Sequence, residues 1–253
     1  MIINNSSVFK DSRKSLANYF DWRRKRSFPA VIRVKKKVRL RKQRVLDLGC
    51  GYGSLTANLL DEGARVVGCE VDQFSLDLAR KFLKGKENYE LIKVSDERLP
   101  FKDKIFDVVF LLDVIEHVEN PAVTISECQR VLKSGGILYV EFTPYYSIAG
   151  HHLYDYTKLP VHMLPKDKVK KMIFSKRVTG TFPATSYWEE FKKLNKIRIN
   201  TFQKLVSEFE PLEEKYIIKY PDIFEINLPF IKHFNGYKDF FTTSFLGIYR
   251  KPS

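Results

Sequence analysis

The stretch Val45–Gly53, which reads VLDLGCGYG, constrains the fold more than any other part of the chain. An apolar run with Asp47 inside it ends in three alternating glycines, and a helical pattern of apolar residues begins at Ser54. This order predicts a buried strand, a sharp turn and a helix. Glycine permits positive φ and lets a ligand lie against bare backbone. Because open α/β sheets bind nucleotides in the loops that follow their strands, the turn is expected to hold a nucleotide.

Composition supports a globular protein with one elaborated domain. The chain has 253 residues, of which 44% are apolar and 14% aromatic, enough to bury a sizeable core. No apolar run approaches the roughly 18 residues of a membrane span, and no apolar signal region stands in the first residues, MIINNSSVFKDSRK. The cysteines, Cys50, Cys69 and Cys128, are odd in number and lie within apolar patterns. Reduced cysteines in a cytoplasmic protein are therefore expected.

Positive charge is concentrated near the amino terminus. The net charge is +14, and twelve Lys/Arg with no acid lie between Trp22 and Leu46, which leaves +2 for the remaining residues (14 − 12). Such a segment could attract the phosphates of RNA or an anionic surface. We favour the simpler interpretation, a solvated helical face, and keep contact with nucleic acid or an anionic surface through residues 23–44 as the alternative.

Residues 1–44 are expected to be mostly helical and peripheral. Two helical segments are predicted, with a break at Ser27–Pro29, because proline disfavours helix at the residue before it. In the first segment, Leu16, Tyr19 and Phe20 share a face at helical spacing that Arg23 could extend. In the second, Val31, Val34 and Val38 do the same. We expect this region to cover the ligand cleft as a lid.

Residues 45–143 alternate between strand and helix patterns. The predicted strands are Val45–Leu48, Arg65–Glu70, Tyr89–Val94, Phe106–Leu111 and Ile137–Phe142. The predicted helices are 54–62, ended by Gly63, then 74–83, and a third that starts at Asn120-Pro121 and runs to Leu132. Near-continuous apolar strands separated by helices predict a parallel sheet that is covered on both faces.

Three acids are expected at one edge of this sheet. Glu70 follows Gly53 by seventeen residues and ends the second strand, where a carboxylate can accept both hydroxyls of a ribose. Asp96 ends the third strand and could accept from an adenine amine, and Asp47 could face an ammonium group or order the loop. Together, the negative charges of these acids would repel a phosphate ligand and attract a cationic nucleoside.

Four motifs between Val45 and Pro144 carry a family resemblance: VLDLGCGYG, VVGCEVD, SDERLPFKDKIFDVVFLLDVIEHV and RVLKSGGILYVEFTP, in this order. The chain resembles class I S-adenosylmethionine-dependent methyltransferases, and most of all their small-molecule and quinone-type branch. The resemblance implies a Rossmann-like, doubly wound α/β sheet of seven strands in the order 3-2-1-4-5-7-6, with strand 7 antiparallel. It implies S-adenosylmethionine as cofactor, S-adenosylhomocysteine as product and O-methylation of a small-molecule or lipid-like acceptor.

The resemblance also implies roles for individual residues. The glycine turn would surround the methionine portion, Glu70 would hold the ribose, Asp96 with Glu97 would flank the adenine, and Leu112 would touch the cofactor through its backbone. The full expected cofactor set is Asp47, Gly49, Cys50, Gly51, Tyr52, Gly53, Glu70, Val71, Asp96, Glu97 and Leu112. Glu70 replaces the Asp that is commoner in the family and should still bridge the ribose.

A dinucleotide-binding dehydrogenase is the rival nucleotide interpretation. Its fingerprint is GxGxxG with an acid about 20 residues further on. Here Gly49, Gly51 and Gly53 give GxGxG, and Ser54 occupies the sixth position. The later motifs do not fit that class either.

The motif DVIEH follows the fourth predicted strand. On a helix, Asp113, Glu116 and His117 would share one face through their i, i+3 and i+4 spacing. Quinone O-methyltransferases resemble the chain here, and in them this group is associated with a divalent metal; such a set could ligate Mg²⁺. We favour the alternative that Glu116 and His117 only pin the loop, so no metal is expected.

Residues 144–199 form a long insertion with three of the five histidines, His151, His152 and His162. Long loops of this kind are usually functional, so we expect a substrate-binding insertion with helices near 166–173 and 187–194. An imidazole could take the proton of the acceptor, and His151 or His152 is preferred to His117. A structural role for the three histidines and a zinc site are the alternatives.

Residues 200–253 complete the predicted domain. Asn200 is expected to cap a helix with apolar positions Phe202, Leu205, Val206 and Phe209. A strand at 216–218, an aromatic crossover at 221–241 and a final strand at 242–250 follow. The single domain thus divides into 1–44, 45–143, 144–199 and 200–253.

Two other functions remain open. An RNA methyltransferase could use residues 23–44 to hold phosphates, but the position after the fourth strand reads LDVIEHV and not the NPPY-type motif of RNA-methylating branches. A non-catalytic cofactor-binding protein would bind S-adenosylmethionine without turnover.

Overall fold

The computed structural model describes residues 16–95, 98–153, 157, 159–175, 184–220, 224–234 and 237–253. Its strands are β1 Arg44–Leu48, β2 Arg65–Glu70, β3 Tyr89–Lys93, β4 Phe106–Leu112, β5 Leu132–Phe142, β6 Glu210–Tyr220, β7 Phe224–Asn227 and β8 Ser244–Arg250. Its helices are α1 Leu16–Lys35, α2 Ser54–Asp61, α3 Gln73–Phe82, α4 Pro121–Val131, η1 Val161–Met163, α5 Lys166–Ile173, α6 Ala184–Lys193, α7 Ile199–Leu205, η2 Pro229–His233 and α8 Lys238–Phe241.

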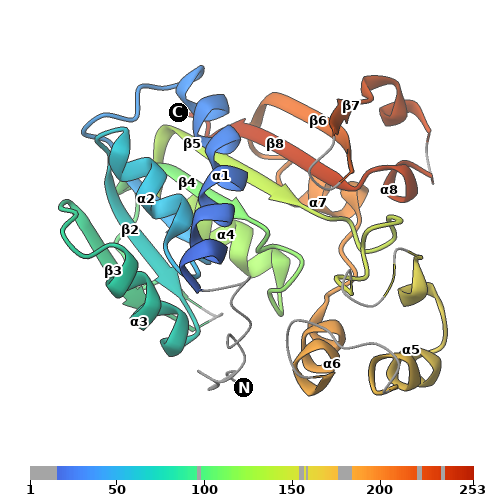
Figure 1. Ribbon diagram of the computed structural model, residues 1–253. Coiled ribbons are helices and arrows are strands. Elements are labelled where there is room, and N and C mark those ends of the chain that lie inside the picture. Colours follow the sequence, from blue (N-terminus) through green and yellow to red (C-terminus); the bar gives the residue numbers. More distant parts are fainter. Residues whose placement is uncertain are drawn as a thin grey trace.

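One mixed sheet organises the molecule, with strand order β3-β2-β1-β4-β5-β8-β6-β7 (Figure 1). β1 to β5 run parallel, and β8 pairs antiparallel with both β5 and β6. The predicted doubly wound order is confirmed, with β6 and β8 in the places of strands 6 and 7. The seven-strand count is corrected by β7, which adds an edge strand to β6 within the expected crossover.

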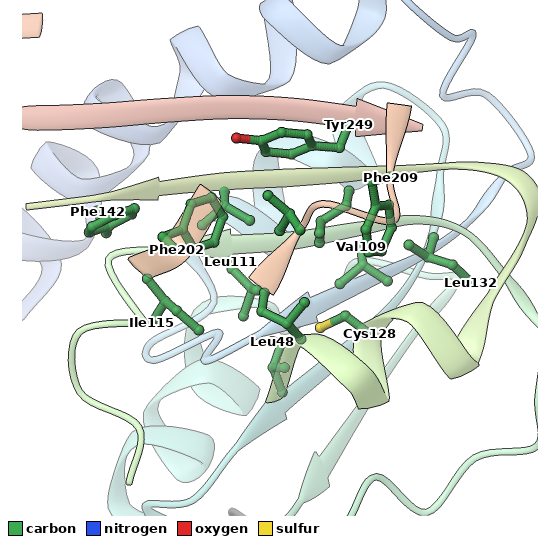
Figure 2. Packing of buried hydrophobic residues seen from close by; sticks show 14 of the residues in the cluster. Leu48, Val109, Leu111, Ile115, Cys128, Leu132, Phe142, Phe202, Phe209 and Tyr249 are labelled. Atoms are coloured by element: carbon green, nitrogen blue, oxygen red, sulfur yellow. The ribbon is translucent and has the colours of Figure 1, made fainter. Parts of the chain in front are cut away.

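Two hydrophobic cores cover the two faces of the sheet. Alternate strand residues point to opposite faces, so Leu46 joins one core and Val45 the other. Figure 2 shows the first core, in which Cys128 of α4 and Phe202 of α7 lie against strand residues such as Leu111. The second core holds side chains of α1 and α2. Both faces of β1, β2 and β4 are therefore largely buried, as their apolar sequences predict, whereas the residues of the edge strand β3 are half-buried or exposed.

The amino-terminal region forms one helix, not two. α1 continues through Pro29, so the predicted break at Ser27–Pro29 is wrong. Asn58 of α2 explains this: its amide donates to the Arg24 carbonyl (2.8 Å) and to Ser27 Oγ (3.0 Å), and its Oδ1 accepts from Arg24 Nε (3.1 Å). These bonds hold the helix on α2 beside the proline, whose missing N–H removes one helical hydrogen bond.

Several helix ends follow their predicted chemistry, and one does not. Asn120 caps α4 by accepting the N–H groups of residues 122 and 123, and Gly63, at φ 75°, ends α2. Asn200, however, makes no capping bond, since α7 already includes it. The carboxylate of Asp239 accepts the Ile199 N–H instead (2.8 Å), so the cap comes from a distant segment.

The insertion folds into a small unit with its own core. α5 has the predicted bounds, and α6 begins three residues before the predicted 187. Buried side chains from η1, α5 and α6 meet Tyr145 and Leu153. Among the helices that the structure describes, none has the length and apolarity needed to cross a bilayer.

Replacing Asn58 by alanine should loosen α1 from α2. The Asn58→Ala change removes three hydrogen bonds at a largely buried site and should lower the free energy of unfolding by about 2 kcal/mol, measured by urea denaturation. Asn200→Ala, at an exposed position, is the matched control and should change it by less than about 0.5 kcal/mol. Equal stability of the two variants would contradict the role of Asn58.

Candidate functional site

The turn between β1 and α2 is held against the end of β2. Gly49, Gly51 and Gly53 all adopt positive φ, from 51° to 81°. A Cβ on Gly49 would collide with the side chain of Val114, whereas one on Gly51 would meet no atom within 4 Å. The N–H groups of Gly49 and Cys50 both donate to the Cys69 carbonyl (2.8 and 2.9 Å). The turn thus presents bare backbone at the carboxyl edge of the sheet.

Two carboxylates flank this turn. Glu70 accepts the N–H groups of Gly51 (2.9 Å), Val71 (2.8 Å) and Asp72 (3.2 Å), which fixes its orientation at the end of β2. Asp47 is buried and accepts from Thr56 Oγ1 at 2.6 Å. Burial raises the pKa of Asp47 to about 6.

A cleft of about 820 Å³ opens beside the turn. Of the expected cofactor residues, Gly49, Tyr52, Glu70 and Val71 line it. Those that the structure describes but does not place in the lining are Asp47, Cys50, Gly51, Gly53 and Leu112. Asp96 and Glu97 lie outside the described residues. The cleft extends away from the turn to His117 and to Glu190 and Lys193 of α6.

The DVIEH segment is a turn, so the prediction that it forms one helical face is wrong. Asp113 has φ 57°, and its carboxylate pairs with Arg23 of α1 at 3.0 Å. The pair places α1 at the wall of the cleft, because Asp113 is one of its lining residues. Whether α1 acts as a lid stays a prediction.

Glu116 and His117 carry unsatisfied polar atoms. Glu116 is buried; its Oε1 accepts the Thr143 N–H at 3.4 Å, and its Oε2 has no hydrogen-bond partner among the described residues. Burial raises its pKa, and the charge of Asp113 raises it further. His117 Nδ1 also lacks such a partner, and burial lowers the pKa of this imidazole. His117 is therefore neutral near pH 7.

The insertion fixes the position of this loop through Asn195. The Asn195 amide donates to the carbonyls of Ile115 (2.7 Å) and Val118 (2.8 Å), and its backbone N–H donates to the Glu116 carbonyl (3.1 Å). Glu190 Oε2 lies 4.0 Å from His117 Nδ1. The placement of Glu116 and His117 thus depends on the segment that follows α6.

The three insertion histidines lie in different surroundings. The His152 ring is 4.9 Å from the His117 ring, centroid to centroid, and burial lowers its pKa to about 3. His151 Nδ1 accepts the Leu153 N–H at 2.9 Å. His162 is buried beside Tyr145, and desolvation lowers its pKa to about 4. Of these three, His152 is the one that meets the DVIEH loop.

One group of candidate metal ligands occurs among the described residues. Ligand atoms of Glu116, His117 and His152 lie within 4.8 Å of one another. Neither the predicted set with Asp113 nor the three insertion histidines form such a group in the part of the chain that is described. Sequence spacing did not indicate this set, since His152 joins it only through folding.

The sequence analysis also missed Arg23, Glu190, Lys193 and Asn195. Glu190 and Lys193 have i, i+3 spacing on α6, which indicates a shared helix face but not that the face lines the cleft. Arg23 was placed in the basic segment and on the first helical face, without a role in the cleft. No local pattern distinguished Asn195, because its hydrogen bonds join residues about 80 positions apart.

Half of the cations in the basic segment form ion pairs within the protein. Six of its twelve cations lie within 4.0 Å of a carboxylate, among them Arg33 beside Glu141 and Lys37 beside Glu213. The others in this group of six are Arg23, Arg24, Arg26 and Lys35. These ion pairs support a structural use of the charges.

Residues 46–140 match the family model described as methyltransferase domain. The chain is 34% identical over 112 residues to a ubiquinone biosynthesis O-methyltransferase of Dechloromonas aromatica, a match that covers 42% of this chain and 47% of the relative. It is 35% identical over 102 residues to a demethylmenaquinone methyltransferase of Clavibacter sepedonicus, covering 40% and 42%. The chain therefore matches less than half the length of these relatives.

The fold also matches a solved methyltransferase. The magnesium protoporphyrin IX methyltransferase of Synechocystis PCC 6803, determined with bound SAH, aligns with a TM-score of 0.59 at 16% identity. The alignment covers 96% of this chain and 90% of that one. The glycine turn, the parallel sheet and these matches agree. Residues 46–140 thus match a methyltransferase domain, and the fold of the chain is that of solved methyltransferases.

Proposed function

We propose that the chain transfers the methyl group of S-adenosylmethionine to a hydroxyl oxygen of a small or lipid-like acceptor of quinol type. The observation that carries this proposal is the single cleft that joins the glycine turn to a neutral imidazole, His117. The names of the matched relatives support an acceptor related to quinone biosynthesis. Methyl transfer needs alignment of acceptor oxygen and sulfonium, and a base for the acceptor's proton.

The cofactor would lie along the turn. Gly49, Gly51 and Gly53 would receive the methionine portion, with Cys50 and Tyr52 beside it, and Glu70 would accept the ribose hydroxyls. A carboxylate can accept about four hydrogen bonds. Glu70 accepts three from backbone N–H groups, so it can still accept one from a ribose hydroxyl. Val71 and Leu112 would contact the adenosyl group, with Asp96 and Glu97 near the adenine. Asp47, ionised above about pH 6, would attract the cationic end of the cofactor.

His117 is the base that the geometry favours. It lines the cleft, and its Nδ1 makes no hydrogen bond within the described part of the chain. His152 contacts its ring and could support it. His151, which the sequence analysis ranked ahead of His117, already uses Nδ1 to accept a backbone N–H.

A divalent ion at Glu116, His117 and His152 is the second candidate for this end of the cleft. Two orphaned atoms, Glu116 Oε2 and His117 Nδ1, fit a metal, and two imidazoles with one carboxylate suit a transition ion better than Mg²⁺. Such an ion would acidify the acceptor hydroxyl when bound. We favour the metal-free interpretation, because Asn195 already holds the loop in place.

Replacing His117 by glutamine should reduce kcat by roughly 10² to 10⁴ fold, because the acceptor loses its base. Methylation of a soluble catechol would be measured at saturating cofactor, and the cofactor Kd should stay within about twofold of the wild-type value because His117 contacts the acceptor. His233→Gln, an exposed histidine on η2, is the control. Unchanged kcat in His117→Gln would contradict the assignment. No turnover of any hydroxyl acceptor by wild-type protein would overturn the proposed function.

Affinity for S-adenosylmethionine should fall as the pH drops below about 6. Burial raises the pKa of Asp47 to that value, so acid neutralises this buried carboxylate, which would attract the cationic cofactor through its charge from outside the cleft lining. Isothermal titration between pH 5 and 7.5 measures the trend. In Asp47→Asn, affinity should be weaker and nearly independent of pH, whereas Asp77→Asn on α3 should behave as wild type. A wild-type Kd that is flat across this range would refute the role.

Removal of metal should leave activity intact. After dialysis against EDTA, kcat should remain within about twofold of the untreated value, because a neutral His117 needs no ion to accept a proton. Loss of activity that Mn²⁺ or Zn²⁺ restores in wild type, but not in His152→Gln, would favour the metal site instead.

A further inference from the structure

The segment from residue 226 to residue 241 exposes an unusual share of the apolar surface. Sixteen large apolar side chains are at least 36% exposed in the described part of the chain, and six of them lie in this short segment. They are Ile226, Phe230, Phe234, Tyr237, Phe240 and Phe241. Phe230 is 56% exposed and Tyr237 is 68% exposed. Exposed apolar side chains that gather in this way mark an interaction surface.

Two ring pairs and two backbone hydrogen bonds bring most of these residues close together. The rings of Phe230 and Phe234 lie 6.2 Å apart, and those of Phe240 and Phe241 lie 5.2 Å apart. The Tyr237 N–H donates to the Phe234 carbonyl (3.1 Å). Ile148 of the insertion is also exposed and donates its N–H to the Phe240 carbonyl (3.1 Å). We define the aromatic patch as Ile148, Phe230, Phe234, Tyr237, Phe240 and Phe241.

The patch lies at the edge of the sheet where the cleft opens. α8 directly precedes β8, and the start of β8 pairs Phe245 with Phe142 at the carboxyl end of β5. The glycine turn follows β1 at the same edge, because β1 and β5 are parallel within the sheet. In Figure 1, α8 lies at the end of the sheet that carries the insertion helices α5 and α6. A surface that contacts the patch would also lie near the insertion.

The charges around the patch are mainly positive. Lys232 is exposed within the segment, and Arg198 reaches α8, where it lies 3.7 Å from the buried Asp239. The adjoining insertion, residues 144–199, has eleven Lys/Arg against four Asp/Glu, a net charge of +7. Protein interfaces are depleted in lysine, whereas aromatic rings beside Lys and Arg are typical of the water–lipid boundary of anionic bilayers.

We propose that the aromatic patch docks the protein on the surface of an anionic lipid bilayer. The aromatic rings would enter the headgroup region, and the cations of the insertion would attract the lipid phosphates. Docking in this orientation brings the mouth of the cleft to the membrane. The delivery of a lipid-like acceptor from the bilayer rests on the proposed function, whereas the docking itself does not.

Cosedimentation with vesicles tests the docking without acceptor or cofactor. Wild-type protein should bind vesicles of phosphatidylcholine with one-third phosphatidylglycerol and should bind pure phosphatidylcholine much more weakly. The double change Phe230→Ser and Phe234→Ser should weaken binding by roughly tenfold or more, since each ring would leave the bilayer. Lys232→Glu should weaken binding to the anionic vesicles and make it less sensitive to salt.

Matched control variants show whether a loss of vesicle binding comes from the patch or from any exposed Phe→Ser or Lys→Glu substitution. Phe28→Ser alters a phenylalanine on α1 that is 47% exposed but far from the patch in the sequence, and it should bind as wild type. Lys84→Glu makes the same charge change at an exposed site after α3. If the serine double variant fails to fold, judged by its melting temperature, Lys232→Glu against Lys84→Glu decides the question alone.

Three outcomes would overturn the proposal. Wild-type protein that binds neither vesicle, or a serine double variant that binds as wild type, shows that the patch does not contact lipid. A wild-type dimer in light scattering that the double variant converts to monomers would assign the patch to a second copy of the chain. Methylation of a soluble catechol should be equal in wild type and the double variant, so failure of docking and failure of the proposed function are distinguishable.

Discussion

The site depends on how the β1–α2 turn is attached to the end of β2. Two consecutive N–H groups of the turn donate to the Cys69 carbonyl, and a third, from Gly51, donates to the Glu70 carboxylate. Because β1 and β2 are parallel neighbours, both strand ends reach the same edge. The turn can follow this path only with positive φ at its glycines. Its path sets the start of α2, from which Thr56 reaches the buried Asp47.

The far end of the cleft depends on the insertion. α6 supplies Glu190 and Lys193 to its lining, and Asn195 bonds to three carbonyls of the loop after β4. The insertion has its own buried cluster, so its helices hold one another in place. The same loop carries Asp113, which Arg23 ties to α1. Elements from three regions of the chain thus fix the surroundings of His117.

Predictions from local sequence patterns were wrong where a residue from a distant segment bonds to the backbone or side chain concerned. Proline predicts a break in the first helix, but Asn58 of α2 fixes the backbone beside it. The spacing of DVIEH fits a helix face, yet Asp113 adopts positive φ and pairs with Arg23. Asn200 has the chemistry of a cap, but Asp239 supplies it. Each error concerns a bond to a residue more than 30 positions away, which periodicity cannot report.

The sequence by itself determined the strand–turn–helix unit, the parallel sheet of β1 to β5 and the acid that ends β2. These features follow from short-range periodicity and from the backbone freedom of glycine, so local spacing is sufficient to predict them. Only the tertiary structure decided which histidines meet. His152 approaches His117, while its neighbour His151 bonds the backbone of Leu153, because long-range packing of the insertion sets where each ring lies.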